Sequence, residues 1–330
     1  MLIKDIDDFK SVYGGVQTTM YWDTWSPFVN EAELGIIIPA IGEEFYDELN
    51  ELVITNATLN GKQARLLGLL KISLAAYADF VGWFRISAST GDAGKVMNTP
   101  ENTQAPAKWF TAAGRRDAQN RGDKFLEQAL VYLEKNADEF ETWKDSDACT
   151  LYDGQFISSA SELTKYFPQA KHSRRVFLQL KEYISSAQEY LAKVVGKAQC
   201  NAWMEKISDA NATISPLEDD AFLLVRAMIA RKAFADALPY LNISEDWRLI
   251  SETDGVVNED ILPQDRRDEL AGLESMNAEK YQNELIRLLQ ANASDNVFPE
   301  YFGSGLYESR IETKSFSKFQ NKPENKFAVL

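Results

Sequence analysis

The chain has 330 residues, of which 45% are hydrophobic and 26% are charged, and its formal net charge is −15. Residues 1–150 carry a net charge of −9, residues 151–304 carry −8, and residues 305–330 carry +2. Affinity for nucleic acid comes largely from basic side chains that neutralise phosphates. The negative net charge of residues 1–150 and of residues 151–304 therefore argues against a protein that binds DNA or RNA tightly.

The pattern of residues 1–150 predicts a series of helices, and a few residues indicate where these helices begin, bend or end. Asp5 is placed to cap a short helix over residues 6–13, and Ser26-Pro27 is a typical helix start because proline loses nothing at the first helical position. Pro39 should kink or break the next helix. The helices expected after it span residues 43–54, 62–87 and 107–136, the last with a break near Gly122. Residues 90–106 are expected to form an exposed loop, and residues 143–154 to join the two halves.

Residues 151–304 repeat this plan. Helices are expected over residues 159–167, 173–206, 217–241 and 269–291. Ser215 and Glu218 form a capping-box pattern at the start of the third, and a loop over residues 245–264 corresponds to the loop over 90–106. The last residues, 305–330, alternate apolar with polar side chains and are expected to form an extended arm.

The clearest sign of repetition is the stretch 76–87, which returns in altered form at 233–244 without a gap. Each copy closes a long apolar helical pattern. Further pairs occur in the same order at similar spacing, with a slip of one residue near Pro39: Leu2-Ile3 with Phe156-Ile157, Ala32-Glu33 with Ala187-Gln188, Gly42 with Gly196, Arg115-Arg116-Asp117 with Arg266-Arg267-Asp268, and Asn136-Ala137 with Asn292-Ala293. Amphipathic helices resemble one another in general, but that does not explain the matched Gly, Arg-Arg-Asp and Asn-Ala positions. The pattern therefore favours an all-α protein made of two tandem copies of a helical-bundle unit, residues 1–150 and 151–304, plus the arm.

Few side chains suited to catalysis are present. The single histidine, His172, lies among Lys171, Arg174 and Arg175, whose positive charge disfavours a general base, so we interpret it as a solvated surface residue. Cys149 and Cys200 are expected to be reduced thiols, which suits a reducing compartment. One imidazole and two distant thiols do not make a zinc site, and no phosphate-binding glycine loop occurs. We therefore predict no catalytic residues, no cofactor and no metal.

Acidic side chains occur in clusters, at Glu43-Glu44, at Glu218-Asp219-Asp220, and at Asp145 with Asp147. Such groups could hold a divalent ion or act as a glycosidase pair. The first two clusters fall in first turns of predicted helices, where the helix dipole favours carboxylates, so solvated helix ends are the preferred interpretation.

Two sets of aromatic side chains are candidates for contact with partner proteins. Tyr21, Trp22 and Trp25 lie close together in an expected loop, where core packing and a protein contact are equally reasonable interpretations. In the arm we favour contact, because so short an extended segment cannot bury its own apolar groups. The candidates there are Tyr307, Phe316, Phe319 and Phe327.

Nothing in the residue pattern indicates a membrane protein. The longest apolar helix, residues 66–86, is interrupted by Lys71, Asp79 and Arg85, which indicates a core helix rather than a membrane span. The first residues lack a basic segment followed by an apolar one, so we expect no secretion signal.

The order of elements in the first copy is similar to that of the head–tail connector, or head-completion adaptor, proteins of long-tailed bacteriophages. The resemblance rests on a short helix, a helix carrying Ala32-Glu33, an apolar run into Ile41-Gly42, and a long Leu/Ala/Tyr/Trp helix over residues 66–84. With residues 94–109, 125–133 and 136–143 included, the pattern resembles an uncharacterised family of Bacteroidota phages and prophages. It covers most of residues 1–150 and returns more loosely over 155–303. Typical connectors are single short units, so the doubling and the arm depart from the pattern.

The resemblance implies an all-helical virion protein that forms a homo-oligomeric ring in the neck, between the portal protein and the tail or a second adaptor. DNA would pass through without specific binding, and the subunits would assemble in the host bacterial cytoplasm. The first rival interpretation is a non-viral helical scaffold or adaptor of the bacterial cytoplasm. The second, an enzyme that uses carboxylates, would require Asp and Glu to converge in a deep pocket.

Overall fold

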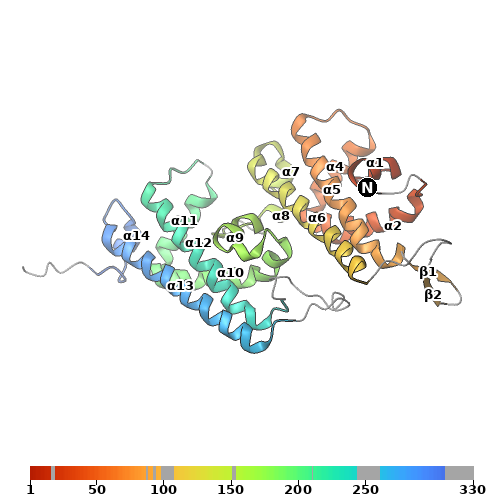
Figure 1. Ribbon diagram of the computed structural model, residues 1–330. Helices are drawn as coiled ribbons and strands as arrows, with labels where there is room; N and C mark the ends of the chain where they lie inside the picture. The colour runs from red at the N-terminus through yellow and green to blue at the C-terminus, as the bar shows by residue number, and fades with distance from the viewer. Residues whose placement is uncertain are drawn as a thin grey trace, which may run out of the picture.

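The computed structural model describes residues 1–15, 19–86, 88–91, 94–97, 108–150, 154–209, 211–243 and 261–308. These residues form two helical bodies that lie side by side (Figure 1), termed repeat 1 (residues 1–150) and repeat 2 (residues 154–308). Each repeat has its own core of buried apolar side chains. An all-α protein built from two tandem copies of a helical unit is therefore confirmed.

The elements of the two repeats occur in the same order. Repeat 1 contains α1 (Ile6–Val12), α2 (Trp22–Ala32), the π-helix η1 (Glu33–Ile37), α3 (Ile38–Ile41), α4 (Glu43–Ile54), α5 (Gly61–Ile86), β1 (Ala88–Gly91), β2 (Gly94–Met97), α6 (Lys108–Lys135), the 3-10 helix η2 (Ala137–Glu139), α7 (Glu141–Lys144) and α8 (Asp147–Thr150). Repeat 2 contains α9 (Ala160–Tyr166), η3 (Pro168–Ala170), α10 (Arg174–Val195), α11 (Lys197–Ser208), α12 (Pro216–Ala237), η4 (Leu238–Tyr240), α13 (Gln264–Asn292) and α14 (Pro299–Phe302). Thus α1 corresponds to α9, α2–α3 to α10, α4 to α11, α5 to α12, and α6 to α13.

Several local details recur in both repeats, which extends the match beyond the order of helices. The buried backbone N–H of Leu2 donates to Glu33 Oε1 at 2.6 Å, and the N–H of Phe156 donates to Gln188 Oε1 at 3.1 Å. Near the end of each repeat a serine hydroxyl donates to a carbonyl three residues earlier at 2.6 Å, Ser146 to Trp143 and Ser304 to Tyr301. These hydrogen bonds recur at corresponding places in the two repeats and support the alignment of the two copies.

The one-residue slip near Pro39 has a structural basis in η1. A π-helix accommodates one extra residue within an α-helix. Buried positions before it match α10 at a spacing of 155 residues (Val29 with Ile184), and those after it match at 154 (Ile41 with Val195). The insertion therefore keeps both sets of apolar side chains in the core, and it lies just ahead of Pro39, whose ring would clash with a regular helical turn.

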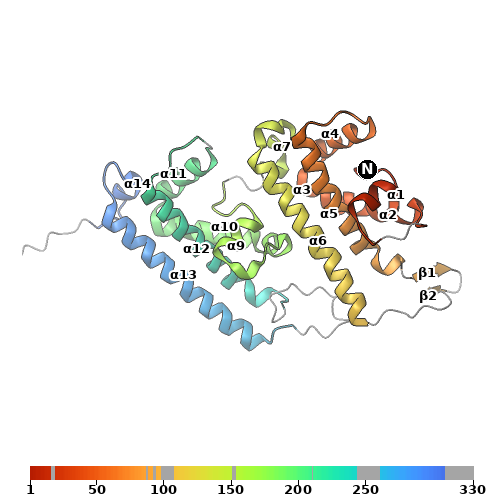
Figure 2. The ribbon, with the colours of Figure 1, turned by 45° about the horizontal axis from the view of Figure 1, so that its top comes forward.

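The long helices α5 and α6 pack closely along much of their length, as α12 and α13 do in repeat 2 (Figure 2). Gly122 lies against the ring of Tyr77, where an added Cβ would come within 2.8 Å of the ring atoms. The expected break at Gly122 is wrong: α6 is continuous, and the glycine serves the close approach of the two helices instead. Because α13 is continuous too, the spacing of 156 residues that aligns Asn136 with Asn292 holds along both helices, and the Arg-Arg-Asp match, at a spacing of 151, is wrong.

Other boundaries also differ from the sequence predictions. The helix predicted from Ser26-Pro27 begins earlier, at Trp22, so Trp22 and Trp25 belong to the first turns of α2 rather than to a loop. The single helix predicted over residues 173–206 is divided at Gly196, whose φ of 90° ends α10. Helix α13 begins at Gln264 instead of 269.

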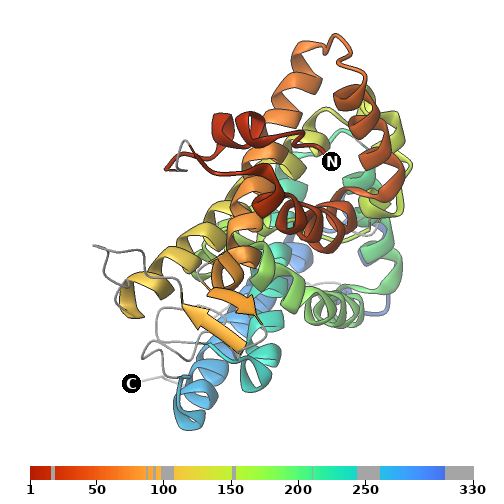
Figure 3. The ribbon, with the colours of Figure 1, turned by 90° about the vertical axis from the view of Figure 1, so that its right-hand side faces the viewer.

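The loop predicted over residues 90–106 begins as a short antiparallel hairpin, β1–β2, which follows α5 and stands away from the helices in Figure 2; in Figure 3 it faces the viewer. The rest of that loop, and most of the loop predicted over 245–264, lies outside the described residues. Asp5 and the Ser215–Glu218 capping box cap α1 and α12 as predicted.

Candidate interaction sites

The two repeats meet where α6 of repeat 1 contacts the start of α9 and α10 of repeat 2. Glu127 of α6 is only 3% exposed, and its Oε1 accepts a hydrogen bond at 2.9 Å from the backbone N–H of Ser161, in the first turn of α9. A carboxylate at a helix N-terminus satisfies a free N–H and is favoured by the helix dipole. Glu127 therefore acts as a capping group supplied by one repeat to the other. We refer to this contact as the joint.

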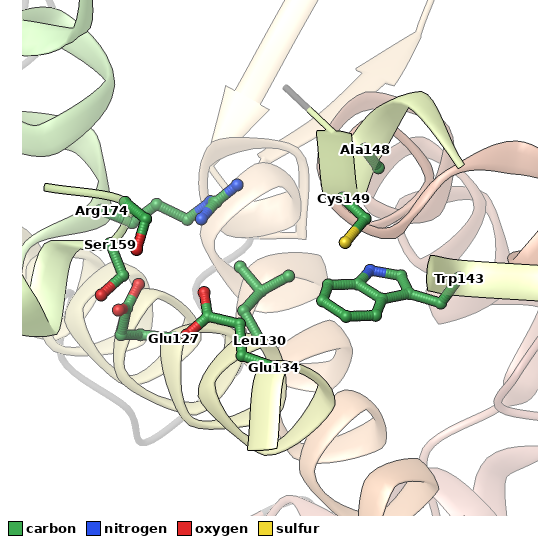
Figure 4. A pocket seen from close by; sticks show the side chains of 9 residues that line it. Glu127, Leu130, Glu134, Trp143, Ala148, Cys149, Ser159 and Arg174 are labelled. Carbon is green, nitrogen blue, oxygen red and sulfur yellow. The ribbon is translucent and has the colours of Figure 1, made fainter. Parts of the chain in front are cut away.

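A small pocket of about 110 Å³ lies at the joint (Figure 4). Carboxylates from α6 and the guanidinium of Arg174 occupy one side, and an indole and a thiol from α7 and α8 occupy the other. Its lining residues are Glu127, Leu130, Glu134, Trp143, Ala148, Cys149, Ser158, Ser159 and Arg174. Two buried polar atoms of the lining, Glu127 Oε2 and Trp143 Nε1, make no hydrogen bond with the residues that the structure describes.

Two carboxyl groups of α6, at and beside the joint, have raised pKa values. Glu134 is an exposed residue, but desolvation of its carboxyl group by the surrounding protein raises its pKa to about 7. The carboxylates of Glu127 and Glu162 act in the same direction, and Arg174 acts in the opposite one. Burial also raises the pKa of Asp123, which accepts a hydrogen bond from a tyrosine hydroxyl at 2.7 Å. The joint can therefore hold a proton near neutral pH.

Metal binding finds no support in the described part of the chain. Among those residues, no group of three or more His, Cys, Asp or Glu side chains is arranged so that it could hold a metal ion. The carboxylates of the joint lie beside a guanidinium instead (Figure 4).

The predicted aromatic contact residues of repeat 1 lie in different environments. Tyr21 is 77% exposed, immediately before α2, and Trp22 is half-buried. Trp25 is 3% exposed, with its ring 4.6 Å from that of Phe9, so it is a core residue and cannot meet a partner in the folded chain. Only Tyr21 and Trp22 of this set present surface to a partner.

Among the predicted contact residues of the arm, Tyr307 is half-buried on repeat 2. Its ring lies 4.8 Å from that of Phe302, and the neighbouring Leu306 carbonyl accepts a hydrogen bond from Gln290 at 2.9 Å. Residues 305–308 are thus attached to α13 and α14. Phe316, Phe319 and Phe327 lie outside the described residues.

The structure also exposes apolar side chains that the residue pattern does not single out. Tyr240 is 78% exposed, Met276 of α13 is 66% exposed, and Phe110 at the start of α6 is 57% exposed. Each belongs to a helical pattern whose apolar positions are mostly buried. Which of them faces outward depends on how neighbouring helices cover each face, and no local sequence signal distinguishes them.

Most of the remaining predicted groups lie at the surface, while the side chain of Glu218 is largely buried. His172 is exposed in the turn before α10, and its backbone N–H donates to Thr164 Oγ1 at 2.9 Å. Glu43 and Glu44 are exposed in the first turn of α4, and Glu218 caps α12.

Helix α5 is, within the described part of the chain, long and apolar enough to cross a membrane, but 56% of its most apolar window is buried inside the molecule. A core helix has the same composition, so this is weak support for a membrane span.

Comparison with known proteins gives a family match and no individual relative. A model of a family of unknown function, DUF6712, matches residues 37–152 and again residues 191–311, one match in each repeat. No curated protein and no solved structure matches the chain. The matched segments together span well over half of the sequence, and the chain therefore belongs to the family of unknown function DUF6712, whose unit it carries twice.

Proposed function

We propose that the chain is a structural virion protein of a tailed bacteriophage, which forms an oligomeric ring in the neck and joins the head to the tail. The observation that carries the proposal is the tandem helical unit, whose first copy resembles head–tail connector proteins in the order and character of its elements. The ring would bind the portal protein on one side and the tail or a second adaptor on the other.

The charge of the chain supports a role in DNA passage. With a formal charge of −15 on each subunit, a ring would surround a channel with negative potential. Like charge keeps the DNA backbone from adhering to the wall. Residues 305–330 are the only basic part, and they would bind a neighbouring subunit or a neck partner.

The proposal is tested by imaging. Electron microscopy of virions, or of the purified protein mixed with its portal protein, should show a ring of this chain at the neck with Asp and Glu facing the lumen. A lumen lined by Lys and Arg would contradict the DNA-passage role, and virions whose necks lack the chain would contradict the proposal as a whole. A gene position beside portal and capsid genes would support it independently.

The alternative is a non-viral helical scaffold or adaptor of the bacterial cytoplasm. It predicts a monomer or small dimer in solution that does not bind a portal protein. Size-exclusion chromatography with light scattering, with and without portal protein, separates the two hypotheses.

A further inference from the structure

The joint between the repeats uses two different surfaces of the same unit. Repeat 1 contributes a face of α6, and repeat 2 contributes the start of α9 and α10. Because the repeats are copies, repeat 2 has its own version of the first surface on α13, and repeat 1 has its own version of the second around α1 and the start of α2. We call these the α13 face and the α1–α2 face.

The α13 face is exposed where its counterpart on α6 is covered. Glu127 is 3% exposed, whereas the matching Asn283 is an exposed surface residue. Asp123 is 7% exposed, and the matching Glu279 is exposed as well. Met276, 66% exposed, lies on the same side of α13 as these two matching residues, at spacings of three and seven residues, and it extends the open face beyond the part that is buried in repeat 1, because the matching Asn120 is itself exposed. The surface that repeat 1 buries in the joint is thus open on repeat 2.

The α1–α2 face of repeat 1 is likewise more exposed than the matching surface of repeat 2, which is buried in the joint. Ala160, at the start of α9, is 0% exposed, but the matching Ile6 is half-buried. Arg174 is 7% exposed, and the matching Thr19 is exposed. Tyr21 and Trp22 stand beside Thr19 in the chain, so this open surface carries the exposed aromatic residues of repeat 1.

Some uncharged residues at or near the joint are replaced by charged residues on the two open faces, and the charges on the two faces are of opposite sign. Ser161 of α9, which contacts Glu127 at the joint, and Val131, one helical turn beyond Glu127 on α6, are both uncharged. Their counterparts on the open faces are Asp7 and Arg287, both exposed and of opposite sign. Lys280, also exposed on the α13 face, adds a second positive charge, and Glu279 of the same face adds one negative charge, so the described charge there is positive on balance. Opposite charges on two facing surfaces favour their association.

From this we propose that the α13 face of one copy binds the α1–α2 face of a second copy, in the arrangement that joins the two repeats within one chain. The inference deepens the ring proposed above and rests on it for closure, but the interface itself is argued from the joint. Because the two surfaces differ, the contact is head-to-tail, and such contacts continue from copy to copy until they close into a ring or extend as a filament.

Site-specific crosslinking of the purified full chain tests the interface. Asp7→Cys and Asn283→Cys occupy the positions that match Ser161 and Glu127, which touch at the joint. Both are introduced together into a Cys149→Ser background, while the second native cysteine, Cys200, is kept because it is buried and its thiol pKa is raised by burial to about 11. The chain is treated with a short bismaleimide. The matched control pairs Asn283→Cys with Glu48→Cys, an exposed position on α4.

A ladder of covalent dimers, trimers and larger species is expected for the first pair and not for the control. Arg287→Asp should reduce assembly by about tenfold in apparent affinity, since it places like charges across the contact. Asp7→Arg combined with Arg287→Asp should restore it. Circular dichroism of every variant confirms that the helices are intact. Monomers at all concentrations, equal crosslinking in the control, or no rescue by the charge swap would overturn the interface.

The outcomes separate this inference from the proposed function. Rings at a phage neck without the expected crosslinks would leave the function standing and remove the interface. A crosslinked ladder from a protein absent from virions would do the opposite.

Discussion

At the scale of single residues, the repeats preserve the groups that the backbone requires and vary the rest. Gly42 and Gly196 both have φ near 90° with ψ near 140°, a conformation that side-chain-bearing residues rarely adopt. The acceptor for the backbone N–H at the matching start of each repeat is a carboxylate in Glu33 and an amide in Gln188. What is kept is the hydrogen-bond acceptor rather than the charge.

The two glycines should be intolerant of any side chain. Gly42→Ala and Gly196→Ala should each lower the free energy of unfolding by about 1–3 kcal/mol, the cost of a strained backbone. Gly42→Ala should cost more, because its Cβ would approach Ser146 to 3.3 Å, whereas the nearest atom to Gly196 is 3.7 Å away. Urea unfolding measures both. Gly68→Ala, within α5 and without near neighbours, is the control and should be neutral or stabilising.

The shared acceptor predicts different results for two substitutions at one position. Glu33→Gln installs the residue of repeat 2, keeps the acceptor for Leu2 N–H and removes a carboxyl whose pKa is raised by burial. It should leave stability within about 1 kcal/mol of wild type, whereas Glu33→Ala should cost about 1–3 kcal/mol because a buried N–H loses its partner. Equal losses in thermal or urea unfolding would contradict this account.

The joint should make stability depend on pH. The pKa of Glu134 is raised from 4.5 to about 7. Between these values the folded chain keeps a proton that the unfolded chain has released, so the free energy of unfolding falls as pH rises through this window. Raised carboxyl pKa values at Asp79 and Asp123 act in the same direction.

Glu134→Gln removes the contribution of this one group, and Gln290 at the matching position of repeat 2 shows that the unit accepts glutamine there. Urea midpoints measured from about pH 5 to 8 should therefore decline less steeply in the variant than in wild type. Identical slopes would show that Glu134 does not titrate in this range.

At the scale of elements, the π-helix η1 is the clearest difference between the repeats. It carries one extra residue between Ala32 and Ile37, whereas α10 spans the matching positions, Ala187 and Leu191, as a regular helix. Comparison of the two copies in the sequence locates the slip. The widened turn that absorbs the extra residue forms because the apolar residues before and after it are buried in the same core.

Deleting Gly35 together with Pro39→Lys should convert α2–α3 into one regular helix like α10, because Lys193 stands at the position that matches Pro39. All buried residues keep their register, so stability should change by no more than about 1–2 kcal/mol. Deleting Asn30 instead leaves Ala32 and Glu33 one position out of register even when η1 becomes a regular turn, so the buried N–H of Leu2 loses its acceptor and the additional cost should be about 1–3 kcal/mol. Circular dichroism and urea unfolding compare the two deletions, and an equal cost would contradict the register argument.

At the scale of the whole molecule, the first residues of the predicted arm belong to the helical body. Residues 305–308 are held on α13 and α14 by Tyr307 and by two hydrogen bonds to Gln290, one from its side chain and one to it. A functional test of the arm should therefore spare them.

Truncation after Glu308 should leave the melting temperature of the helical body within a few degrees of wild type and reduce assembly, if residues 309–330 bind a neighbouring copy or a neck partner. Truncation after Ser304 should in addition lower the melting temperature, because Tyr301 and Phe302 lose the ring of Tyr307. Calorimetry and light scattering measure the two effects. Unchanged assembly after the shorter truncation would remove the arm from the interface.

The helical class, the duplication, the caps at Asp5 and Ser215, and the site of the one-residue slip could all be predicted from the order of residues. These features depend on local periodicity and on residue types that favour particular backbone positions, and both are readable in a linear pattern. Only the folded chain shows that Trp25 is core, that Gly122 admits a neighbouring ring, and that Glu127 caps a helix of the other repeat. Each of these depends on which face of a helix another segment covers, and that is set by packing between residues distant in the chain.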